Sequence, residues 1–182
     1  HMGATPDQDF THNVNSRTSW NLRAAVSTKN ENWKEKRSAM QNVCSQCHGD
    51  SFVDRFYEQF DSAVTHYNNK FAKPAGKIMQ KLREEDLLTE EPFDEEIEWT
   101  YFELWHHEGR RTRHGAAMMG PDYVQWHGFY DLTKHFRYKF VPQAEELKEG
   151  ITDEVLKDMD IHPLQGPEAA RKAAGTAEEA TE

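Results

Sequence analysis

The chain has 182 residues, 30% of them charged and 12% aromatic, with a formal net charge of −10. This length suits one domain with a tail, and the aromatic content argues against disorder. No basic stripe suggests nucleic-acid binding, and no apolar run approaches the roughly 20 residues of a membrane span, so neither a nucleic-acid partner nor a membrane span is expected.

The first half of the chain predicts a loop region, a short helix and then a long one. Residues 1–30 are rich in Thr, Asn, Asp and Ser without a helical period, whereas residues 33–43 suit a short helix. From Asp54 the pattern is strongly helical. Its apolar positions recur every three or four residues at Phe56, Phe60, Val64, Tyr67 and Phe71. Pro74 is expected to end or kink this helix, which continues to Leu87, and no convincing strand pair is evident.

Two further helices are predicted in the second half. A turn at residues 89–92 leads into a helix that begins near Asp94 and runs to about Met119. Gly120 and Pro121 predict a stop and a restart. The apolar face of the last helix is formed by Val124, Phe129, Leu132, Phe136 and Phe140. Beyond Pro142 the aromatic residues disappear, and residues 141–182 hold 11 acidic and 4 basic side chains.

These elements predict an all-α fold. An irregular N-terminal segment (1–53) is followed by a long antiparallel three-helix bundle (54–141), which we expect to mediate oligomerisation, and by an acidic, flexible tail (142–182).

The N-terminal segment contains the pentapeptide Cys44-Ser-Gln-Cys-His48, which includes both cysteines of the chain. Two thiols at this spacing form thioethers to the two vinyl groups of one porphyrin, and the following histidine then ligates the iron. A zinc site is the alternative, but it requires two more ligands that only histidines such as His12 or His66 could supply. The motif therefore predicts a covalently attached haem c, held by Cys44, Cys47 and His48.

The haem iron needs a second axial ligand or an open position for a substrate. The candidates are His12, His66, His106, His107, His114, His127, His135 and the methionines. His107 and His114 lie seven residues apart, so they are expected to share one helix face with Leu104 and Met118. His66 and His135 lie among polar neighbours and are expected at the surface.

Three arginines near these histidines, Arg110, Arg111 and Arg113, suit two roles equally well. They are the kind of side chain that pairs with haem propionates, and they also suit a solvated basic patch on a helix.

Three segments together resemble the C-terminal part of octahaem hydroxylamine oxidoreductases, a family that includes the hydrazine dehydrogenases of anammox bacteria. They are residues 105–130 (WHHEGRRTRHGAAMMGPDYVQWHGFY), residues 52–60 and the motif at 44–48. The resemblance covers about residues 1–140. It implies seven electron-transferring haems, one catalytic P460-type haem and a homotrimer, assembled here through the long helices, in which a tyrosine from a neighbouring subunit bonds to the catalytic haem.

The resemblance also implies roles for individual residues. His12 matches a distal-ligand position, for a haem that can lie outside this chain, and His1 is either the end of a preceding haem motif or a cloning scar. His114 is the expected distal ligand from the long helix, with His107 and His127 as alternatives. Tyr123 is the expected cross-linking tyrosine, with Tyr130 as the alternative. This chain departs from the family pattern in having one haem motif rather than eight.

The implied function is oxidation of hydroxylamine (to nitric oxide or nitrite) or of hydrazine (to dinitrogen), with a redox partner cytochrome. The compartment is the periplasm or its equivalent, which in an anammox bacterium is the anammoxosome lumen. This segment then supplies an electron-transfer haem and the tyrosine, and alone it is not expected to be catalytic. Two alternatives remain: a stand-alone monohaem electron carrier, and an octahaem nitrite reductase that lacks the tyrosine cross-link.

Overall fold

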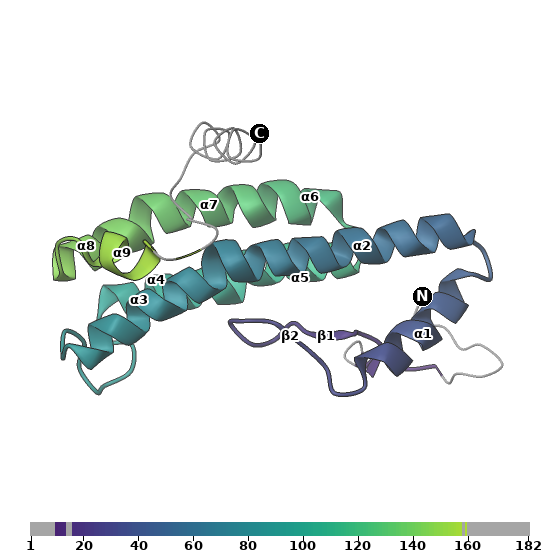
Figure 1. Cartoon of the computed structure of the whole chain (residues 1–182), viewed down its shortest axis with the longest axis horizontal. Coiled ribbons are helices and arrows are strands. Elements are labelled where there is room, and N and C mark those ends of the chain that lie inside the picture. Colours follow the sequence, from purple (N-terminus) through teal and green to yellow (C-terminus); the bar gives the residue numbers. More distant parts are fainter. Residues whose placement is uncertain (1–9, 14–15, 158, 160–182) are drawn as a thin grey trace, which may run out of the picture.

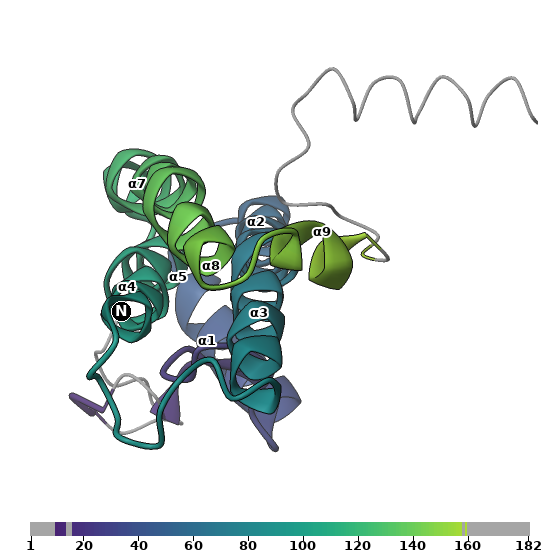
Figure 2. The same ribbon diagram turned by 90° about the vertical axis from the view of Figure 1, so that its left-hand side faces the viewer.

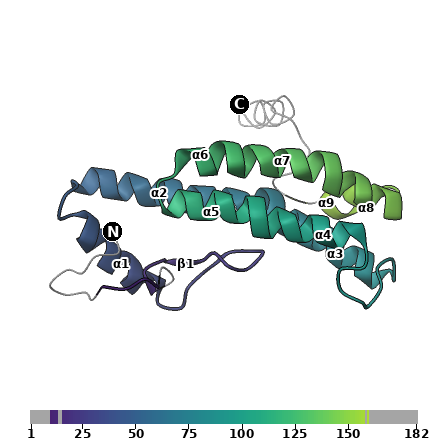
Figure 3. The same cartoon turned by 180° about the vertical axis from the view of Figure 1, so that it is seen from behind.

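A computed structural model of the chain describes residues 10–13, 16–157 and 159. Three long helices form most of it, and each is built from consecutive helical segments (Figures 1 and 3). The first contains α2 (Asp50–Tyr67), η2 (Asn68–Ala72) and α3 (Lys73–Glu84). The second contains α4 (Glu96–Glu103), η3 (Leu104–Glu108) and α5 (Gly109–Ala117). The third contains α6 (Pro121–Val124), η4 (Gln125–Tyr130), α7 (Asp131–His135), η5 (Phe136–Phe140) and α8 (Val141–Leu147).

Consecutive long helices run antiparallel, and the predicted all-α fold is confirmed (Figures 1 and 3). The second helix ends where expected. Met119 there adopts a left-handed conformation with φ of 56°, the Gly120 amide bonds to the Gly115 carbonyl at 2.8 Å, and Pro121 begins α6. None of the helices in the described ranges has both the length and the apolar character that a membrane crossing requires.

The η segments are short stretches of π-helix, and two of them end two residues before a proline. Pro74 follows η2 by two residues, and Pro142 follows η5 in the same way. A proline has no N–H to donate and its ring crowds the carbonyl four residues earlier, so a widened turn at that point relieves the mismatch. The long helices therefore continue through both prolines. The helix does not end at Pro74, whereas the predicted kink there stays a prediction.

The larger of two apolar clusters fills the space between the long helices and includes a helix that the sequence did not predict; the smaller one contains Leu22, Phe60 and Val64. This helix, α9 (Ile151–Leu156), packs against α3 and α8, as the end-on view in Figure 2 shows. The side chains of Ala144, Ile151 and Leu156 are 0% exposed. The prediction of an acidic, flexible tail from residue 142 is thus wrong for residues 142–157, because α8 and α9 bury these three side chains in the core. Residues 160–182 lie outside the described part.

The N-terminal part lies beside α2 and contains two short strands and one helix. Strand β1 (Trp20–Asn21) pairs antiparallel with β2 (Thr28–Lys29), with Trp20 opposite Lys29. Strands of two residues are too short to leave an alternating pattern, which explains why the sequence did not predict them. Helix α1 (Trp33–Cys44) agrees with the predicted helix at 33–43.

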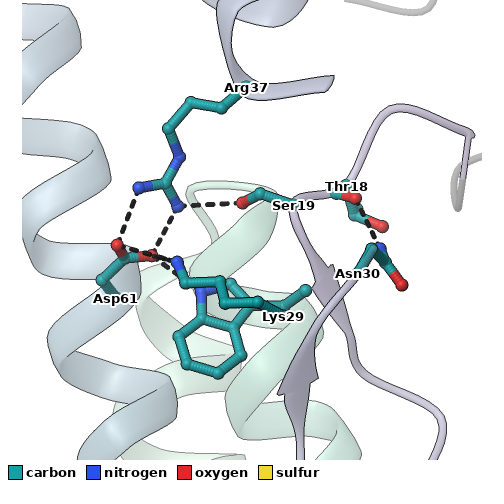
Figure 4. A network of polar contacts seen from close by, with 7 residues as sticks. Thr18, Ser19, Lys29, Asn30, Arg37 and Asp61 are labelled. Atoms are coloured by element: carbon teal, nitrogen blue, oxygen red, sulfur yellow. Dashed lines mark hydrogen bonds and ion pairs between the residues drawn. The ribbon is translucent and has the colours of Figure 1, made fainter. Parts of the chain in front are cut away.

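One carboxylate on α2, that of Asp61, holds this N-terminal part in place (Figure 4). Arg37 of α1 donates two hydrogen bonds to it, at 2.7 and 2.6 Å, and the Lys29 ammonium lies 2.9 Å from Oδ1. The Trp20 indole N–H donates a further hydrogen bond to Oδ1 at 2.7 Å. A third bond from Arg37 reaches the Ser19 hydroxyl at 2.8 Å, so β1 and α1 are both tied to α2.

These contacts change the acidity of Asp61. Burial by itself raises the pKa of this carboxyl, but the hydrogen bonds from Arg37, Trp20 and Lys29 outweigh burial and lower the pKa to about 2. A carboxyl whose folded-state pKa lies below its unfolded value stabilises the fold above the unfolded pKa, and this stabilisation is lost as pH falls toward the folded value.

Replacement of Asp61 by Asn should lower the free energy of unfolding at pH 7 by about 1–2 kcal/mol, after allowance for the partial exposure of the side chain. The difference between wild type and Asp61→Asn should shrink as pH falls from 5 to 2, because Asp61 is protonated first in the unfolded chain and only near pH 2 in the folded protein. Denaturant titrations at pH 7, 4 and 2.5 measure both effects. An undiminished difference at pH 2.5 would contradict the assigned pKa.

The second and third long helices approach closely at Gly128 of η4. A Cβ atom built there would lie 2.4 Å from the Tyr123 carbonyl oxygen and 2.5 Å from the Thr112 hydroxyl on α5. Neither backbone can retreat without moving a whole helix. A side chain at this position is therefore excluded by packing rather than by backbone conformation.

The Gly128→Ala substitution should reduce the free energy of unfolding by about 2–3 kcal/mol through overpacking, although alanine is the better helix former. Gly120→Ala is the matched control, because a Cβ atom there meets nothing closer than 3.7 Å. Thermal and denaturant unfolding of the two variants should differ clearly. Equal stabilities would show that the two helices can separate at no cost.

Candidate haem site

The CxxCH motif forms a tight turn between α1 and α2. Helix α1 ends at Cys44, whose carbonyl accepts hydrogen bonds from the amides of Cys47 at 3.1 Å and His48 at 3.0 Å. The His48 ring stacks on Phe52, one turn into α2, with ring centroids 4.4 Å apart. The turn thus brings the two thiols and the imidazole together at the end of α1, as attachment of one porphyrin requires.

A cavity of about 420 Å³ lies next to this turn, and four parts of the chain line it. Met40, Cys44 and His48 come from α1 and the motif, and Phe56, Tyr57 and Phe60 from α2. Arg17, Thr18 and Ser19 come from the N-terminal segment, and His114, Ala117, Met118 and Met119 from the end of the second long helix. Residues from distant parts of the sequence therefore meet around one space.

His114 lies in the wall that α5 contributes to this cavity and is partly buried. Burial lowers its pKa, and the neighbouring Arg113, Arg110 and Arg23 lower it further. A neutral imidazole is the form that binds iron. His114 is therefore in a protonation state and a place that suit the second axial ligand, opposite the motif that carries His48.

Two more groups of the cavity, Cys44 and Tyr57, are also held neutral. Burial raises the pKa of the Cys44 thiol. Burial, and to a lesser degree the neighbouring Cys44, raises the pKa of Tyr57 to about 12.

The residues present fit a haem. Aromatic and thioether side chains form most of the cavity surface, which suits the apolar faces of a porphyrin. The Thr18 hydroxyl is buried in one wall without a hydrogen-bond partner among the described residues, which suits a polar group at the porphyrin edge. Cys44, Cys47, His48 and His114 would hold such a haem.

The remaining candidate histidines lie away from this cavity, whereas three of the candidate methionines, Met40, Met118 and Met119, line it. His107 and His127 are both exposed, and His127 lies 3.4 Å from the Asp122 carboxylate. His12 is exposed and contacts the Phe10 ring, which fits no ligand role at this cavity. Its predicted role, as ligand to another haem, stays a prediction.

The predicted face shared by His107, His114, Leu104 and Met118 is wrong. Leu104 is buried in the core, whereas His107 is exposed and Met118 is 72% exposed. The π turn η3, at residues 104–108, has more residues per turn than an α-helix, so each residue rotates less and a spacing of seven residues no longer returns to the same side.

His135 was also expected at the surface, and this too is wrong. Its side chain is 15% exposed and lies 3.4 Å from Glu108 and 3.7 Å from Glu103 on the second long helix. Burial raises the pKa of the Glu108 carboxyl, but His135 outweighs burial, and the net shift is downward. His135 therefore joins two long helices and lies outside the cavity.

Arg110, Arg111 and Arg113 were expected either to pair with haem propionates or to form a solvated basic patch. Arg113 has neither role. It is 0% exposed and donates to the carbonyls of Ala24, Trp105 and Gly109 and to the Ser27 hydroxyl. Arg110 contacts His106 and the Arg23 carbonyl, and Arg111 is exposed. The arginine that does line the cavity is Arg17, which sequence reasoning missed because it lies in a segment without periodicity.

Tyr123 lies at the start of the third long helix and is 56% exposed. Trp126 and Tyr130 follow on the same helix and are 63% and 54% exposed. A second cavity, of about 980 Å³, lies between α2 and this part of the third helix and shares Phe56, Phe60 and Met119 with the first. The exposed rings of Tyr123, Trp126 and Tyr130 are thus available for contact with the surface of another protein chain.

The helical fold, the CxxCH turn and the cavity define a c-type cytochrome segment. The family described as seven times multi-haem cytochrome CxxCH matches residues 2–94, just over half of the 182-residue chain. The chain belongs to this family of multihaem c-type cytochromes. Covalent haem c is its cofactor and electron transfer is the function that the family indicates. No curated protein and no solved structure matches the chain.

Proposed function

We propose that this chain carries one electron-transfer haem, attached to Cys44 and Cys47 and ligated by His48 and His114. The observation that carries the proposal is that His114, from α5, lines the same cavity as Cys44 and His48. Sixty-six positions of sequence separate the two histidines, and the fold brings them to one space.

The chain's own residues then define a closed iron site. Haem c supplies a one-electron change between ferric and ferrous iron when it is bound. Two imidazole ligands leave no position for a substrate, which suits electron transfer. Phe56, Phe60 and Met40 limit the access of water to the site.

His114→Ala should convert this haem from a low-spin to a high-spin ferric absorption spectrum, because one strong-field ligand is lost. His107→Ala and His127→Ala are the controls, and both should keep the wild-type spectrum, since these exposed side chains lie away from the cavity. Spectra of the purified haem-loaded proteins measure the effect. A low-spin spectrum in His114→Ala, with a high-spin one in either control, would reassign the ligand.

We further propose that the chain works as part of an oxidoreductase that oxidises hydroxylamine or hydrazine. The resemblance of residues 105–130 to octahaem hydroxylamine oxidoreductases supports this activity and an extracytoplasmic location. In this proposal the P460-type haem belongs to the parent protein. Tyr123 of one subunit bonds to it in a neighbouring subunit of a homotrimer.

The position of Tyr123 supports that role. A tyrosine can react with a group in another subunit only if its ring leaves its own core, and Tyr123 is 56% exposed beside a helix break. The exposed Trp126 and Tyr130 on the same helix support an interface between subunits.

Tyr123→Phe in the native multihaem protein should abolish the covalent link between subunits, because the phenol oxygen or the adjacent ring carbon no longer reacts. Tyr130→Phe should retain it. Denaturing gel electrophoresis and mass spectrometry of haem-bearing peptides detect the link. Loss of the link in Tyr130→Phe alone would transfer the role to Tyr130, and absence of a link in wild type would favour a nitrite reductase.

A stand-alone monohaem electron carrier is the second candidate. It is favoured by one observation: the described residues contain a complete apolar core and both proposed axial ligands of the single CxxCH motif. The number of haems per chain in the native protein separates the two candidates.

A further inference from the structure

Arg113 of α5 is a buried cation whose partners among the described residues include no carboxylate. Its side chain is 0% exposed, and its guanidinium lies 4.3 Å from the centre of the Tyr67 ring. It donates, at 2.6–2.9 Å, to four uncharged oxygens: the carbonyls of Ala24, Trp105 and Gly109 and the Ser27 hydroxyl. These acceptors satisfy the N–H groups of the guanidinium but leave its unit charge in place.

This charge lies next to the proposed second axial ligand. Arg113 directly precedes His114, which lines the 420 Å³ cavity beside Cys44 and His48. Its charge acts on the His114 imidazole more strongly than those of Arg110 and Arg23, and all three have the same sign. A buried positive charge is therefore fixed behind the wall that faces the proposed haem.

Burial determines how strongly such a charge acts. Water and dissolved ions screen an exposed charge, whereas a charge in the protein interior is screened much less. Ferric iron carries one more positive charge than ferrous iron, so a positive charge nearby destabilises the ferric state more. A buried cation beside an axial ligand is thus expected to favour the ferrous haem.

We propose that the charge of Arg113 raises the reduction potential of the haem. This inference rests on the proposed ligation of the haem by His48 and His114. Arg113 touches neither the iron nor a substrate and takes up no electron itself. It acts through space, and its four acceptors and the Tyr67 ring hold the guanidinium in one place.

Arg113 also has a structural role, because it ties the N-terminal part to α5 through Ala24 and Ser27. Loss of these bonds should lower stability whatever the charge does. The reduction potential separates the two roles, since it should follow the charge near the haem and not the number of hydrogen bonds.

The first test uses this chain with its covalent haem and compares Arg113→Gln with Arg111→Gln, which removes the same charge from an exposed position on α5. At the wild-type midpoint potential, Arg113→Gln should raise the ferric-to-ferrous ratio about tenfold, which corresponds to about 59 mV for one electron. Arg111→Gln should change it less than about twofold. A shift in Arg113→Gln no larger than that in Arg111→Gln would overturn the proposal.

Ser27→Ala is the control for structure. It removes one of the oxygens that accept from Arg113, at 2.7 Å, and leaves the charge unchanged. Its stability should fall, while its ferric-to-ferrous ratio should stay within about twofold of wild type. If Ser27→Ala shifted the potential as far as Arg113→Gln does, packing rather than charge would set the potential, and the proposal would be wrong.

A second pair of variants keeps Arg113 in place and decides the matter if Arg113→Gln fails to fold or to load haem. In Ser27→Asp, a carboxylate can accept the bond that the hydroxyl accepts now and so neutralise the guanidinium. Ser27→Asn has nearly the same size and no charge. At one applied potential, Ser27→Asp should show a several-fold higher ferric-to-ferrous ratio than Ser27→Asn, and equal ratios would contradict the role of Arg113.

Failure of the underlying haem assignment looks different. In that case the wild-type chain itself would lack covalent haem or a low-spin spectrum, whereas failure of the proposal leaves both intact and changes only how the potential responds to these variants.

Discussion

The arrangement of the haem site depends on one partly buried ionic contact, the Asp61 carboxylate with its donors Trp20, Lys29 and Arg37. Asp61 lies on α2, which is fixed in the bundle core by Val64 and Tyr67. Its partners belong to elements that bury few apolar side chains of their own, and α1 buries none fully. Without this contact, the hydrophobic effect would constrain the N-terminal part only weakly.

A second cation, Arg113, ties the same N-terminal part to the other long helix. Its guanidinium lies 4.3 Å from the centre of the Tyr67 ring and donates to Ala24 and Ser27. Ser27 is also paired with Asn68 at the start of η2, through both its N–H and its carbonyl. Since Arg113 directly precedes His114, the anchor that fixes the N-terminal part also fixes the wall opposite Cys44 and His48. Burial without a carboxylate partner lowers the pKa of Arg113, and the four oxygens that accept from it offset this cost.

Local patterns in the sequence predicted the long helices and the haem motif well. The apolar stripe that includes Phe60, Val64 and Phe71 is buried as expected, because its period follows directly from helix geometry. The CxxCH spacing reflects the covalent chemistry of one porphyrin, so it is readable without any tertiary information.

The features that the sequence did not predict arise from tertiary packing or from irregular helix geometry. The π turn at 104–108 changes which side of the helix His107 occupies, and residue periodicity assumes that no such turn exists. Arg113 carries the signature of a surface residue and becomes buried only because carbonyls from residues 24 and 105 converge on it. Helix α9 has three buried residues, too few to form a recognisable stripe.

The turn between the second and third long helices lies between the proposed ligand of the electron-transfer haem, His114, and the proposed cross-linking residue, Tyr123. Gly115 follows His114, and a Cβ atom there would lie 2.9 Å from the Tyr123 Cβ, so the two helices touch directly beside the ligand. His114 faces the cavity within the chain, whereas Tyr123 is exposed on the other side of the same contact. In the proposed function, one rigid turn therefore sets the position of a haem ligand and of the tyrosine that reaches a neighbouring subunit. A fixed separation between these two groups is what electron transfer between subunits requires, and the lack of a side chain at Gly115 lets the two helices lie in direct contact there.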